Sequence, residues 1–432
     1  MSRVIKFFNT IKNNWKKSVV GAAALSYGVS YANQSYQANL LMTAYCKEAV
    51  KYGDEIIPPT RAPRHITIIL NPVARKRKAK KLFEKYCEPL FHLAGISVTI
   101  LQTEKESQAR QLIENLNTST DGILVAGGDG TLLDVVTGLM RKCNGSTFCA
   151  QQIPIGILPL GEANRIANSI FGSKHDELPH IRQMIDASMA AVRGITKFID
   201  VVKVEPLEQD EENSIKPIYA LSSIELGAWR DADSRKNKYW YWGNLRRYVT
   251  YVFNGFKNDL NWNCNATIRY TDPCPGCSKC YQQNQSPGQS DVRWWHVFIP
   301  KKITFGQSNQ VDYSKVKNDD CDKFKETHVA ATELSLVTNN LNNSQSGPPA
   351  VKLQVGPESI NYIEFVTEGW RRIKGKKKVI ENIFEAKEIE FLPDSTEDSN
   401  KKENYFSIDN EEFELRPMKI KLIPNAVKIF CP

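Results

Sequence analysis

The sequence contains 432 residues, of which 41% are hydrophobic and 24% charged, and its 57 Lys and Arg residues outnumber 48 Asp and Glu residues to give a net charge of +9. This length exceeds one ordinary domain, and the composition excludes collagen-like, intrinsically disordered and disulfide-built secreted chains. The modest positive charge suits anionic partners in general, namely a nucleotide, an acidic lipid surface or a nucleic acid, and does not choose among them.

Residues 1–50 are predicted to be a membrane-targeting segment. The first acidic residue is Glu48, and residues 1–17 carry five Lys and Arg residues. On a helical wheel these cations lie opposite an apolar face, made by Val4, Phe7, Phe8, Ile11 and Trp15. Basic amphipathic helices of this kind occur at membrane surfaces and in mitochondrial targeting segments. The uncharged stretch 18–46 has an apolar part shorter than the roughly 20 residues of a spanning helix, so packing on the protein, lying in the membrane interface and spanning it all stay open.

Short apolar strands alternate with helices between residues 60 and 195. We predict strands at 65–70, 96–102, 122–125 and 153–158. We predict helices at 79–94, 105–116, 130–141, 162–171 and 177–192. Strands of this length separated by helices form a parallel sheet that is covered on both faces. The segment is therefore predicted to be a doubly wound α/β domain, in which ligands gather at the carboxyl ends of the strands.

Residues 196–432 contain mostly β-rich runs and are predicted to form a second domain, an antiparallel β-sandwich or a barrel. We predict strands at 198–204, 218–224, 266–270, 294–298, 334–338, 362–367, 388–392, 405–408 and 419–430. Loop insertions are expected near 271–293 and 339–350, which are rich in small and polar residues, and a charged surface loop at 395–403.

The strongest chemical signal is the run Gly127-Gly128-Asp129-Gly130-Thr131, which follows one predicted strand and opens a helix. Glycine permits a sharp turn and a close approach of the backbone to a ligand, and a helix N-terminus binds phosphate through its unpaired N–H groups. Asp129 could hold Mg²⁺ or accept the proton of an attacking hydroxyl. The alternative is a tight turn with Asp129 as the helix N-cap. The place of the run between strand and helix favours a nucleotide site.

Three further loops follow the neighbouring strands and are expected to meet this one at the same edge of the sheet. Asn71-Pro72 follows the first strand and leads into the basic stretch Arg75–Lys81, whose cations can lie over phosphates or form a solvated face. Thr103-Glu104 follows the second strand. Gly161 and Asn164 follow the fourth strand, at another glycine turn before a helix.

In this order the four loops resemble the catalytic domains of diacylglycerol kinases and sphingosine kinases. Residues 229–243, with Asp231 and Asp233, are similar to the lipid-headgroup segment of sphingosine kinases. Residues 408–412, just before Pro417, resemble the Asp-Gly-Glu element of the same fold. Within this superfamily, the mitochondrial acylglycerol kinases are similar over nearly the whole chain.

The resemblance implies an ATP-dependent lipid kinase, with Mg²⁺ as cofactor and an active site in the cleft between the two domains. Its substrates would be mono- and diacylglycerol, with ceramide or sphingosine as further acceptors, and its products lysophosphatidic and phosphatidic acid. It also implies a mitochondrial protein at the inner membrane, with its body facing the intermembrane space, an anionic lipid surface as partner and no nucleic acid partner. A second implied role is that of a subunit of the inner-membrane translocase for carrier proteins.

The resemblance also implies roles for individual residues. The nucleotide-binding residues would be Asn71, Pro72, Arg75, Thr103, Gly127, Gly128, Asp129, Gly130, Thr131, Gly161, Asn164, Arg246 and Glu411. The catalytic residues would be Asp129 and Asp409, either of which could be the base, and Asp129 and Glu411 would hold Mg²⁺. Asp231 and Asp233 would contact the lipid substrate.

Three positions depart from the family pattern: Asn410 stands in place of Gly, Glu162 in place of Thr, and Arg165 in place of Asp. Simpler interpretations of the later residues also stay open. Asp231 and Asp233 could be ordinary loop carboxylates, and Asp409-Asn410 could be a hairpin turn. The aromatic residues 240–242 could be sandwich core or could contact an acyl chain.

The chain has ten cysteines, most of which are expected to be packed thiols. Cys274, Cys277 and Cys280 form a Cys-x-x-Cys-x-x-Cys run, with Cys264 nearby. This run could bind zinc, form a disulfide or remain as thiols. A structural zinc takes four ligands, usually as two close pairs, and only one tight group is present. The pattern therefore favours a disulfide or thiols.

Two other functions compete with the lipid kinase. NAD kinases and phosphofructokinases also use Gly-Gly-Asp-Gly turns, but the Asn-Glu or Asn-Asp pair of NAD kinases does not occur between residues 170 and 240. The other alternative is a purely structural translocase subunit with weak or no kinase activity.

Overall fold

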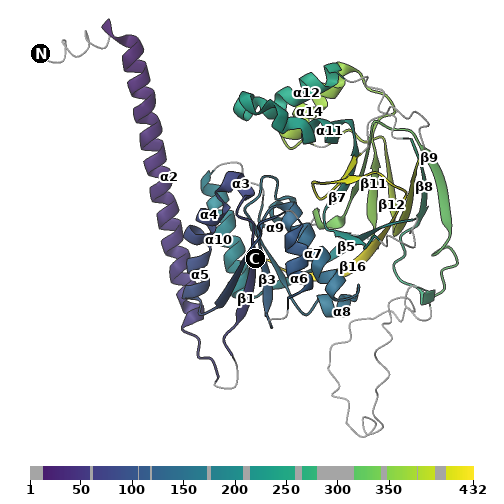
Figure 1. Ribbon diagram of the computed structural model, residues 1–432, viewed down its shortest axis with the longest axis horizontal. Helices are drawn as coiled ribbons and strands as arrows, with labels where there is room; N and C mark the ends of the chain where they lie inside the picture. The colour runs from purple at the N-terminus through teal and green to yellow at the C-terminus, as the bar shows by residue number, and fades with distance from the viewer. Residues whose placement is uncertain are drawn as a thin grey trace, which may run out of the picture.

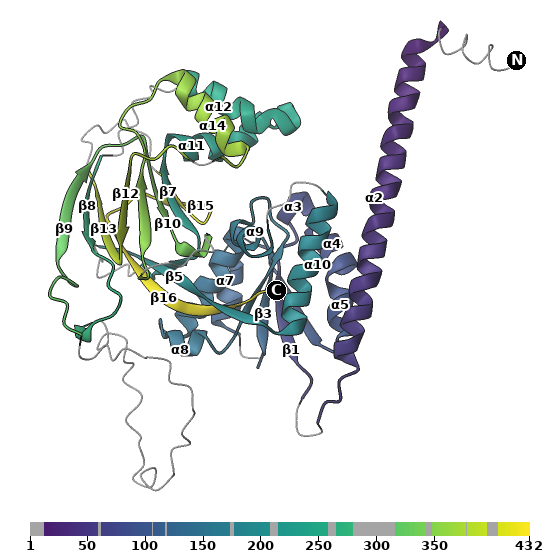
Figure 2. The same cartoon turned by 180° about the vertical axis from the view of Figure 1, so that it is seen from behind.

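The computed structural model describes residues 13–58, 62–105, 107–116, 119–172, 177–207, 215–257, 265–279, 316–341, 348–376, 378–394 and 405–432. Two lobes lie side by side, and one long helix stands against the first of them (Figures 1 and 2). Several predicted segments lie outside the described residues, wholly or in part. These are residues 1–12 of the basic helix, the centres of the insertions near 271–293 and 339–350, the strand 294–298 and the loop 395–403.

The first lobe is a parallel sheet with helices on both faces, which confirms the predicted doubly wound fold. Its strands lie in the order β2–β1–β3–β4, with bounds β1 (His65–Leu70), β2 (Ser97–Gln102), β3 (Gly122–Gly127) and β4 (Ile155–Pro159). Its helices are α3 (Ala74–Arg77), α4 (Ala79–Tyr86), α5 (Glu88–Leu93), α6 (Gln108–Glu114), α7 (Asp129–Lys142), α8 (Thr147–Ala150), α9 (Arg165–Phe171) and α10 (Glu177–Arg193). The helix predicted at 79–94 is broken at Cys87, between the end of α4 and the start of α5 at Glu88, and Pro89 lies in the first turn of α5.

Both faces of this sheet are buried because successive side chains of a strand point to opposite sides. Ile68 and Leu70 of β1 lie in one hydrophobic core with α4, α5 and α10. Ile69, between them, lies in a second core with α6 and α7. A near-continuous apolar strand is stable only in such a two-sided position, which is why β3 has no polar side chain and β1 has only His65 and Thr67.

The second lobe is a sandwich of antiparallel strands, as predicted. One sheet has the order β12–β11–β10–β7–β14–β15, and it faces the strands β16, β13, β8 and β9 of the other sheet across a single core. The strands are β5 (Thr196–Pro206), β6 (Ile218–Ala220), β7 (Ser223–Gly227), β8 (Ala266–Thr271), β9 (Phe324–Val329), β10 (Glu333–Val337), β11 (Val351–Val355), β12 (Asn382–Ala386), β13 (Glu388–Pro393), β14 (Tyr405–Ile408), β15 (Glu411–Glu414) and β16 (Met418–Phe430), with the short 3-10 helix η4 (Asn339–Leu341) after β10. The single strand predicted at 218–224 is divided into β6 and β7.

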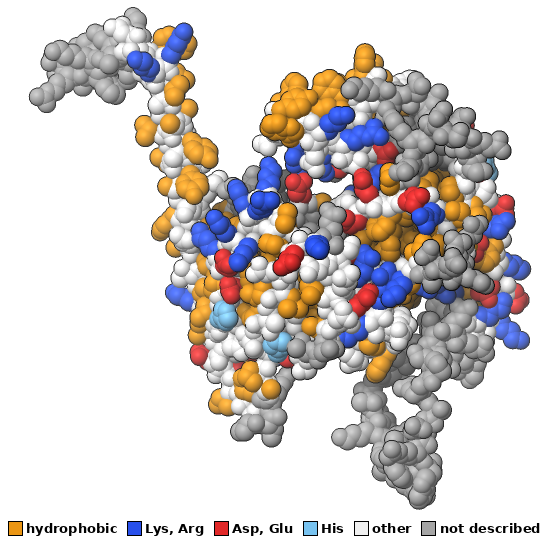
Figure 3. All heavy atoms as spheres, in the orientation of Figure 1, with side chains coloured by type: hydrophobic (Ala, Val, Ile, Leu, Met, Phe, Trp, Pro, Cys, Tyr) orange, Lys and Arg blue, Asp and Glu red, His pale blue; other side chains and the backbone are white. Residues whose placement is uncertain are grey.

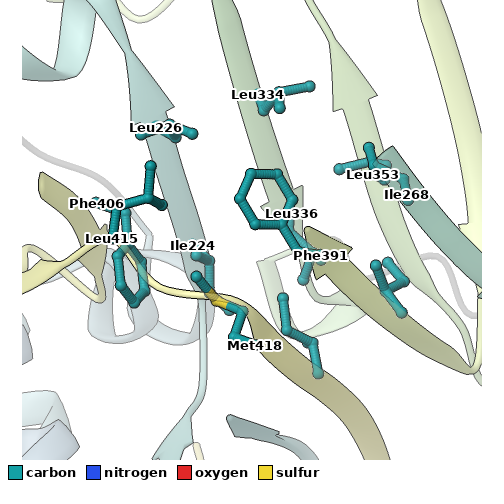
Figure 4. A pocket seen from close by; sticks show the side chains of 12 residues that line it. Ile224, Leu226, Ile268, Leu334, Leu336, Leu353, Phe391, Phe406, Leu415 and Met418 are labelled. Carbon is teal, nitrogen blue, oxygen red and sulfur yellow. The ribbon is translucent and has the colours of Figure 1, made fainter. Parts of the chain in front are cut away.

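Between the two sheets of the sandwich lies an apolar cavity of about 40 Å³ (Figure 4). The side chains that line it come from both sheets and are all apolar, among them Leu226, Leu336, Phe391 and Met418. A single water molecule needs roughly 10–15 Å³ of such a cavity, so this one is too small for more than a few water-sized groups. It offers no partner for a phosphate.

The strand β16 joins the two lobes into one continuous sheet. Its end pairs in parallel with β4, at Ile429 and Ile155, and its length pairs antiparallel with β5. Its beginning pairs with β13 of the sandwich. The last residues of β16 therefore belong to the sheet of the first lobe. The domain boundary predicted at residue 195 does not interrupt this sheet, because strands on both sides of it pair with β16.

Helical segments cover one end of the sandwich (Figures 1 and 2). They are α11 (Ala228–Ser234), the 3-10 helix η1 (Arg235–Leu245), α12 (Arg246–Lys257) and α14 (Tyr362–Ile373). The strand predicted at 362–367 is wrong. Asn361 and Glu364 form a capping box that starts a helix there, and Phe365, Val366 and Gly369 are buried at helical spacing. Tertiary packing has overridden the β propensity of this segment.

The helix α2 (Trp15–Gly53) has 39 residues, a length of roughly 58 Å. Its end packs on the first lobe, where the Tyr45 hydroxyl donates to Asp186 at 2.5 Å and Glu48 pairs with Arg193 at 2.7 Å. Its beginning projects away from the lobes (Figure 1, purple), and Leu25 and Tyr27 there are 73% and 76% exposed. Among the described residues, no helix has both the length and the apolar character needed to cross a bilayer.

Cys143 and Cys149 form a disulfide that joins the end of α7 to α8. These two residues are therefore not the packed thiols that the sequence favours. A disulfide persists where reducing thiol systems do not reach it.

Candidate active site at the junction of the two lobes

The four loops that the sequence places at one edge of the sheet do meet there. Asn71, after β1, donates its side-chain amide to the hydroxyl of Thr131 at the start of α7, at 3.2 Å. The N–H of Thr103, after β2, donates to Leu70 O at 2.9 Å, and that of Leu160, after β4, donates to Gly127 O at 3.1 Å. The strand order reverses between β1 and β3, and ligands of doubly wound sheets bind at this switch point. Pro72 is half-buried beside it.

The glycines of this edge are required by close contacts. Gly127, Gly128 and Gly130 all have negative φ, so none of them needs the left-handed conformation. A Cβ on Gly127 would lie 2.7 Å from the Thr131 hydroxyl, and one on Gly161 would lie 2.3 Å from the Cα of Gly128. Two loops therefore touch backbone to backbone, and a ligand at this edge would meet their peptide N–H groups directly.

Asn164 holds the second of these glycine turns. It is the N-cap of α9 with a φ of 49°, and it is buried. Its side-chain oxygen accepts from Gly161 N at 3.0 Å and its side-chain nitrogen donates to Gly161 O at 3.0 Å. The amide of Asn164 is engaged with the loop, so its contribution is to shape the turn.

Asp129 is the first residue of α7, and its carboxylate lies at the centre of the site. It is 8% exposed. One oxygen accepts from the backbone N–H of Arg165 at 2.9 Å, and the other accepts from the side chain of Asn410 at 3.1 Å. Burial, together with the nearby charge of Asp409, raises the pKa of Asp129 to about 6, although Arg165 and Asn410 oppose the rise. A carboxylate with this pKa is suited to accept a proton near neutral pH.

Asp409 is buried and faces the second lobe. Its carboxylate accepts backbone N–H groups from Leu221, Ser222 and Ser223, at 2.7, 2.8 and 2.9 Å, and also the hydroxyl of Ser222. It thereby holds the turn that separates β6 from β7. Asp409 and Asn410 both have positive φ, 46° and 72°, and they form the two-residue turn of the hairpin β14–β15. Asparagine tolerates this conformation, so Asn410 fills a glycine-like position and also contacts Asp129.

Glu411, next in this hairpin, lies against the start of α7. A Cβ on Gly130 would lie 1.7 Å from a carboxylate oxygen of Glu411, so glycine is needed there to admit this side chain. Asp129 and Glu411 are therefore brought to the same end of α7 from the two lobes. In nucleotide sites Mg²⁺ is held by one or two carboxylates together with phosphates and water. This pair of carboxylates fits that requirement.

Arg165, which departs from the family pattern, anchors a partly buried network of charges that the sequence did not reveal. Its guanidinium donates to both carboxylate oxygens of Glu225, at 3.0 and 3.1 Å, and to the Ser223 hydroxyl at 2.6 Å. Lys378 also pairs with Glu225, and burial, which alone would raise the pKa of Glu225, is outweighed by these two cations, which lower it well below its usual range. The network fastens α9 of the first lobe to β7 of the second.

This network continues to the segments α11, η1, α12 and α14 at the end of the sandwich, which together are called the helical cap. Lys378 also contacts Glu333, which accepts two hydrogen bonds from Arg372 of α14 at 2.7 and 2.5 Å. Arg372 in turn lies over the ring of Trp229 in α11, at 4.2 Å from its centroid. A line of partly buried charges therefore runs from the glycine loops to the helices that cover the sandwich.

Arg75 and Arg246 lie on opposite sides of the junction. Arg75 contacts His180 of α10, and burial together with the charge of Arg75 lowers the pKa of His180 to about 4. Arg246 begins α12 and pairs with Glu162 of the β4–α9 loop at 3.3 Å. The latter pair bridges the two lobes next to Gly161.

Asp231 and Asp233 lie on α11, in different surroundings. Asp231 is buried, and its carboxylate accepts from Arg230 at 2.8 Å; burial raises its pKa. Arg230 also pairs with Glu412, which places Asp231 beside the β14–β15 hairpin that reaches Asp129. Asp233 is paired with Lys236 at 2.9 Å at the surface. The structure thus brings Asp231 towards the site, whereas Asp233 faces outward.

Replacing Gly161 with Ala is expected to raise the KM for ATP about tenfold or more, because the added methyl group would collide with the backbone of the Gly127–Thr131 loop. Steady-state kinetics at varied ATP concentration measure this effect. Gly28→Ala is the control, since no atom lies within 4 Å of a Cβ at that position of α2. An unchanged KM in Gly161→Ala would show that this loop contact does not shape the nucleotide site.

A glycine loop between strand and helix at the switch point of a parallel sheet, with a buried carboxylate at its centre, defines a phosphotransferase. Residues 65–204 match the diacylglycerol kinase catalytic domain family, and residues 221–432 match the acylglycerol kinase C-terminal family. The human protein named mitochondrial acylglycerol kinase is 33% identical over 429 residues, which cover 98% of this chain and 96% of that protein. The protein of the same name from Xenopus laevis is 31% identical over 439 residues, covering 100% and 96%.

Two more distant proteins are also similar to this chain. Human ceramide kinase is 27% identical over 289 residues, which cover 58% of this chain and 50% of that protein. A crystal structure from Bacillus anthracis str. Sterne, described as a candidate diacylglycerol kinase, has a TM-score of 0.50 at 14% identity and covers 87% of this chain and 99% of that one; it shows the fold alone. The chain belongs to the acylglycerol kinase family. It is a lipid kinase, as predicted, and membership implies that ATP is the phosphate donor.

Proposed function

We propose that this chain transfers the γ-phosphate of ATP to the free hydroxyl of mono- and diacylglycerol, giving lysophosphatidic and phosphatidic acid. The observation that carries the proposal is the buried carboxylate of Asp129 at the start of α7, where four loops of the first lobe meet a hairpin of the second. The names of the full-length relatives support acylglycerols as the substrate class. Ceramide and sphingosine are further acceptors to be tested.

The ATP phosphates would lie over the loop Gly127–Thr131, where unpaired N–H groups at the start of α7 and the positive end of the helix dipole favour anions. Asn71, Pro72, Thr103 and the Gly161–Asn164 turn would shape the surrounding edge. Arg75 and Arg246 would supply positive charge from either side. These residues act mainly by positioning and by electrostatic stabilisation, which is what phosphoryl transfer requires.

Asp129 and Glu411 would hold Mg²⁺, which supplies neutralisation of phosphate charge when it is bound. Asp129 would also accept the proton of the lipid hydroxyl as that oxygen attacks phosphorus. Asp409, whose carboxylate holds the residue 221–223 turn, would be a positioning residue that sets the hairpin carrying Asn410 and Glu411. Asp231, beside that hairpin, would contact the lipid headgroup, and Asp233 would contribute at the outer edge of the lipid site.

The lipid would be taken from a membrane that docks on the helical cap. Large side chains are exposed there on η1, α12 and α14, and Figure 3 shows apolar side chains gathered over this end of the molecule; they include Trp240, Tyr241, Trp242, Leu245, Phe256, Ile363 and Trp370. Cations are exposed on the same helices, at Lys238, Arg247, Arg371 and Lys374. Aromatic side chains beside cations suit the interface of an anionic bilayer. The exposed half of α2 would add a second membrane contact.

The relatives' name supports a mitochondrial location, and the Cys143–Cys149 disulfide supports a body in the intermembrane space, outside the reducing matrix. The inner membrane is the location that the family resemblance implies. The translocase-subunit role that the resemblance implies would use surfaces away from Asp129. The kinase and the scaffold role are separable by the Asp129 variant described in the Discussion.

The experiment combines purified full-length protein, Mg²⁺ and labelled ATP with monoacylglycerol, diacylglycerol, sphingosine or ceramide in anionic or neutral vesicles. We expect label in the two acylglycerols and faster transfer on anionic vesicles. The double variant Trp240→Ser/Trp242→Ser is expected to bind anionic vesicles about tenfold more weakly and to raise the KM for vesicle lipid with kcat nearly unchanged. Absence of label in every lipid would overturn the proposed activity, and unchanged vesicle binding would overturn the docking surface.

A further inference from the structure

Three cysteines from two distant segments meet at one end of the sandwich. Cys274 and Cys277 follow β8, and Cys321 precedes β9. Their sulfur atoms all lie within 4.8 Å of one another. The pairing of β8 with β9, which ends at Thr271 and Phe324, brings the two segments together (Figure 1, lower right). In Figure 1 this place is at the end of the sandwich away from α11, α12 and α14.

Cys321 changes the interpretation of the cysteine run. From the sequence, the run supplied only one tight group of ligands, and its other members, Cys280 and Cys264, lie outside the described residues. A structural zinc site is built from ligands on two segments, usually with a Cys-x-x-Cys pair on one of them. The structure supplies that pair in Cys274 and Cys277, and a ligand from the second segment in Cys321.

The spacing of the sulfurs suits one ion. A Zn–S bond of about 2.3 Å in a tetrahedron separates two sulfurs by roughly 3.8 Å, so the observed arrangement needs to contract by no more than about 1 Å. The turn between Cys274 and Cys277 passes through Gly276, whose φ is 132°. Residues that carry a side chain rarely adopt this backbone conformation. Glycine at this position therefore permits the turn that brings both thiols to the same side.

Two polar side chains contact the sulfur atoms. The side-chain amide of Asn318 donates to the Cys274 sulfur at 3.4 Å, and the ammonium group of Lys387 lies 3.9 Å from the Cys321 sulfur. Cys277 and Cys321 are only 0% and 2% exposed. Three buried thiolates side by side would repel one another, and a divalent cation held between them would offset that cost.

Two further contacts hold the segments in register around the sulfurs. Ser278 N donates to Val316 O at 2.9 Å, and Lys279 pairs with Asp322 at 3.7 Å. A prearranged site of this kind loses less entropy on binding an ion than two separate segments would.

We propose that Cys274, Cys277 and Cys321 hold a Zn²⁺ ion as thiolates, and that the ion fastens the β8–β9 end of the sandwich. Three sulfur donors select a soft or borderline metal over Mg²⁺ or Ca²⁺. The remaining position of a tetrahedral ion would be taken by a donor outside these three side chains. The competing chemistry is a disulfide between two of them, which the Cys143–Cys149 disulfide makes a real alternative in this protein. The proposal does not depend on the kinase activity.

The test measures metal content by elemental analysis on full-length protein purified without chelator. We expect about one zinc per chain, falling to less than about a fifth in Cys277→Ser and in Cys321→Ser. The matched controls are Cys46→Ser and Cys431→Ser, whose cysteines lie outside the cluster and which are expected to keep the ion. Replacement of zinc by cobalt is expected to produce thiolate-to-metal charge-transfer absorption in the wild type and in the controls.

A second measurement uses the wild-type chain alone, in case the variants do not fold. A strong chelator is expected to release the zinc, to make the three thiols reactive toward iodoacetamide and to lower Tm, and added Zn²⁺ is expected to reverse all three changes. A wild-type chain without zinc, or mass spectrometry of unreduced protein showing a disulfide within the cluster, would overturn the proposal. Retention of zinc in Cys321→Ser would also overturn it.

Discussion

Asp129→Asn is expected to lower kcat by about 10²–10⁴-fold and to make the folded chain more stable at pH 7.5. The loss of activity follows from removing the proton acceptor and a Mg²⁺ ligand together. The gain in stability follows from the pKa of Asp129, which burial and Asp409 raise from 3.8 to about 6 in the folded chain. The charged carboxylate of Asp129 therefore lowers the free energy of unfolding at neutral pH, by about 3 kcal/mol at most. Labelled-ATP assays and chemical denaturation measure the two effects.

The sign of this effect can be checked with pH. Because the folded pKa is raised, the cost of the charge is present above about pH 6 and is relieved as the pH falls towards 3.8, so the stability advantage of Asp129→Asn should vanish there. In the wild type, kcat/KM is expected to fall as the pH drops through about 6. In Asn410→Ala this acid limb should move to higher pH, because a hydrogen bond that lowers the pKa is lost.

The matched control is Asp200→Asn. Asp200 is also buried, with a pKa raised by burial, but it lies in β5 and accepts from Asn425 N at 2.9 Å. This variant is expected to change stability and to keep activity. Protein import by the Asp129→Asn variant tests the scaffold role, which is expected to survive. Kinase activity near the wild-type level in Asp129→Asn would remove the proposed base, and import that fails as completely as phosphorylation would contradict the separation of roles.

Arg165→Met is expected to destabilise the fold by about 3–5 kcal/mol, because it leaves the buried carboxylate of Glu225 with Lys378 as its remaining cation. Urea denaturation measures the change. Arg269→Met is the matched control: Arg269 pairs with Glu326 on the surface, with both side chains about half exposed, so its loss should cost less than about 1 kcal/mol.

Two further measurements test whether the destabilisation by Arg165→Met comes from the unpaired charge of Glu225. The double variant Arg165→Met/Glu225→Met removes both charges and is expected to recover most of the lost stability. The pKa of Glu225 is lowered in the folded chain, so the stabilisation is present above its ordinary value of 4.5 and is lost at lower pH; the difference between wild type and Arg165→Met should narrow below pH 4.5. If Arg165→Met lowers the free energy of unfolding as little as Arg269→Met does, the network does not hold the two lobes together.

Much of the first lobe was predictable because its signals are local. The apolar runs of β1 and β3, the glycine loop and the amphipathic helices each depend on neighbours in the sequence, and parallel strands bring the loops that follow them to one edge. Gly127–Thr131, Asn71 and Gly161 could therefore be placed together before their contacts were known. The helix at 362–373 was missed because its β-branched residues are good strand formers, although the capping box Asn361–Glu364 is a local helix signal that the prediction overlooked; packing against α12 adds to it.

By itself, the sequence determined the α/β nucleotide lobe, the sandwich that follows it, the loops of the site and the lipid kinase family. The tertiary structure decided which groups those loops face. It directs Asp409 into the residue 221–223 turn, pairs Arg165 with Glu225, places Asn410 against Asp129 and joins Cys321 to the Cys274–Cys277 turn. These partners are far apart along the chain, and no periodicity or propensity connects them. Their proximity depends on how β16 joins the two lobes into one sheet and on how β8 pairs with β9, and both are products of long-range packing.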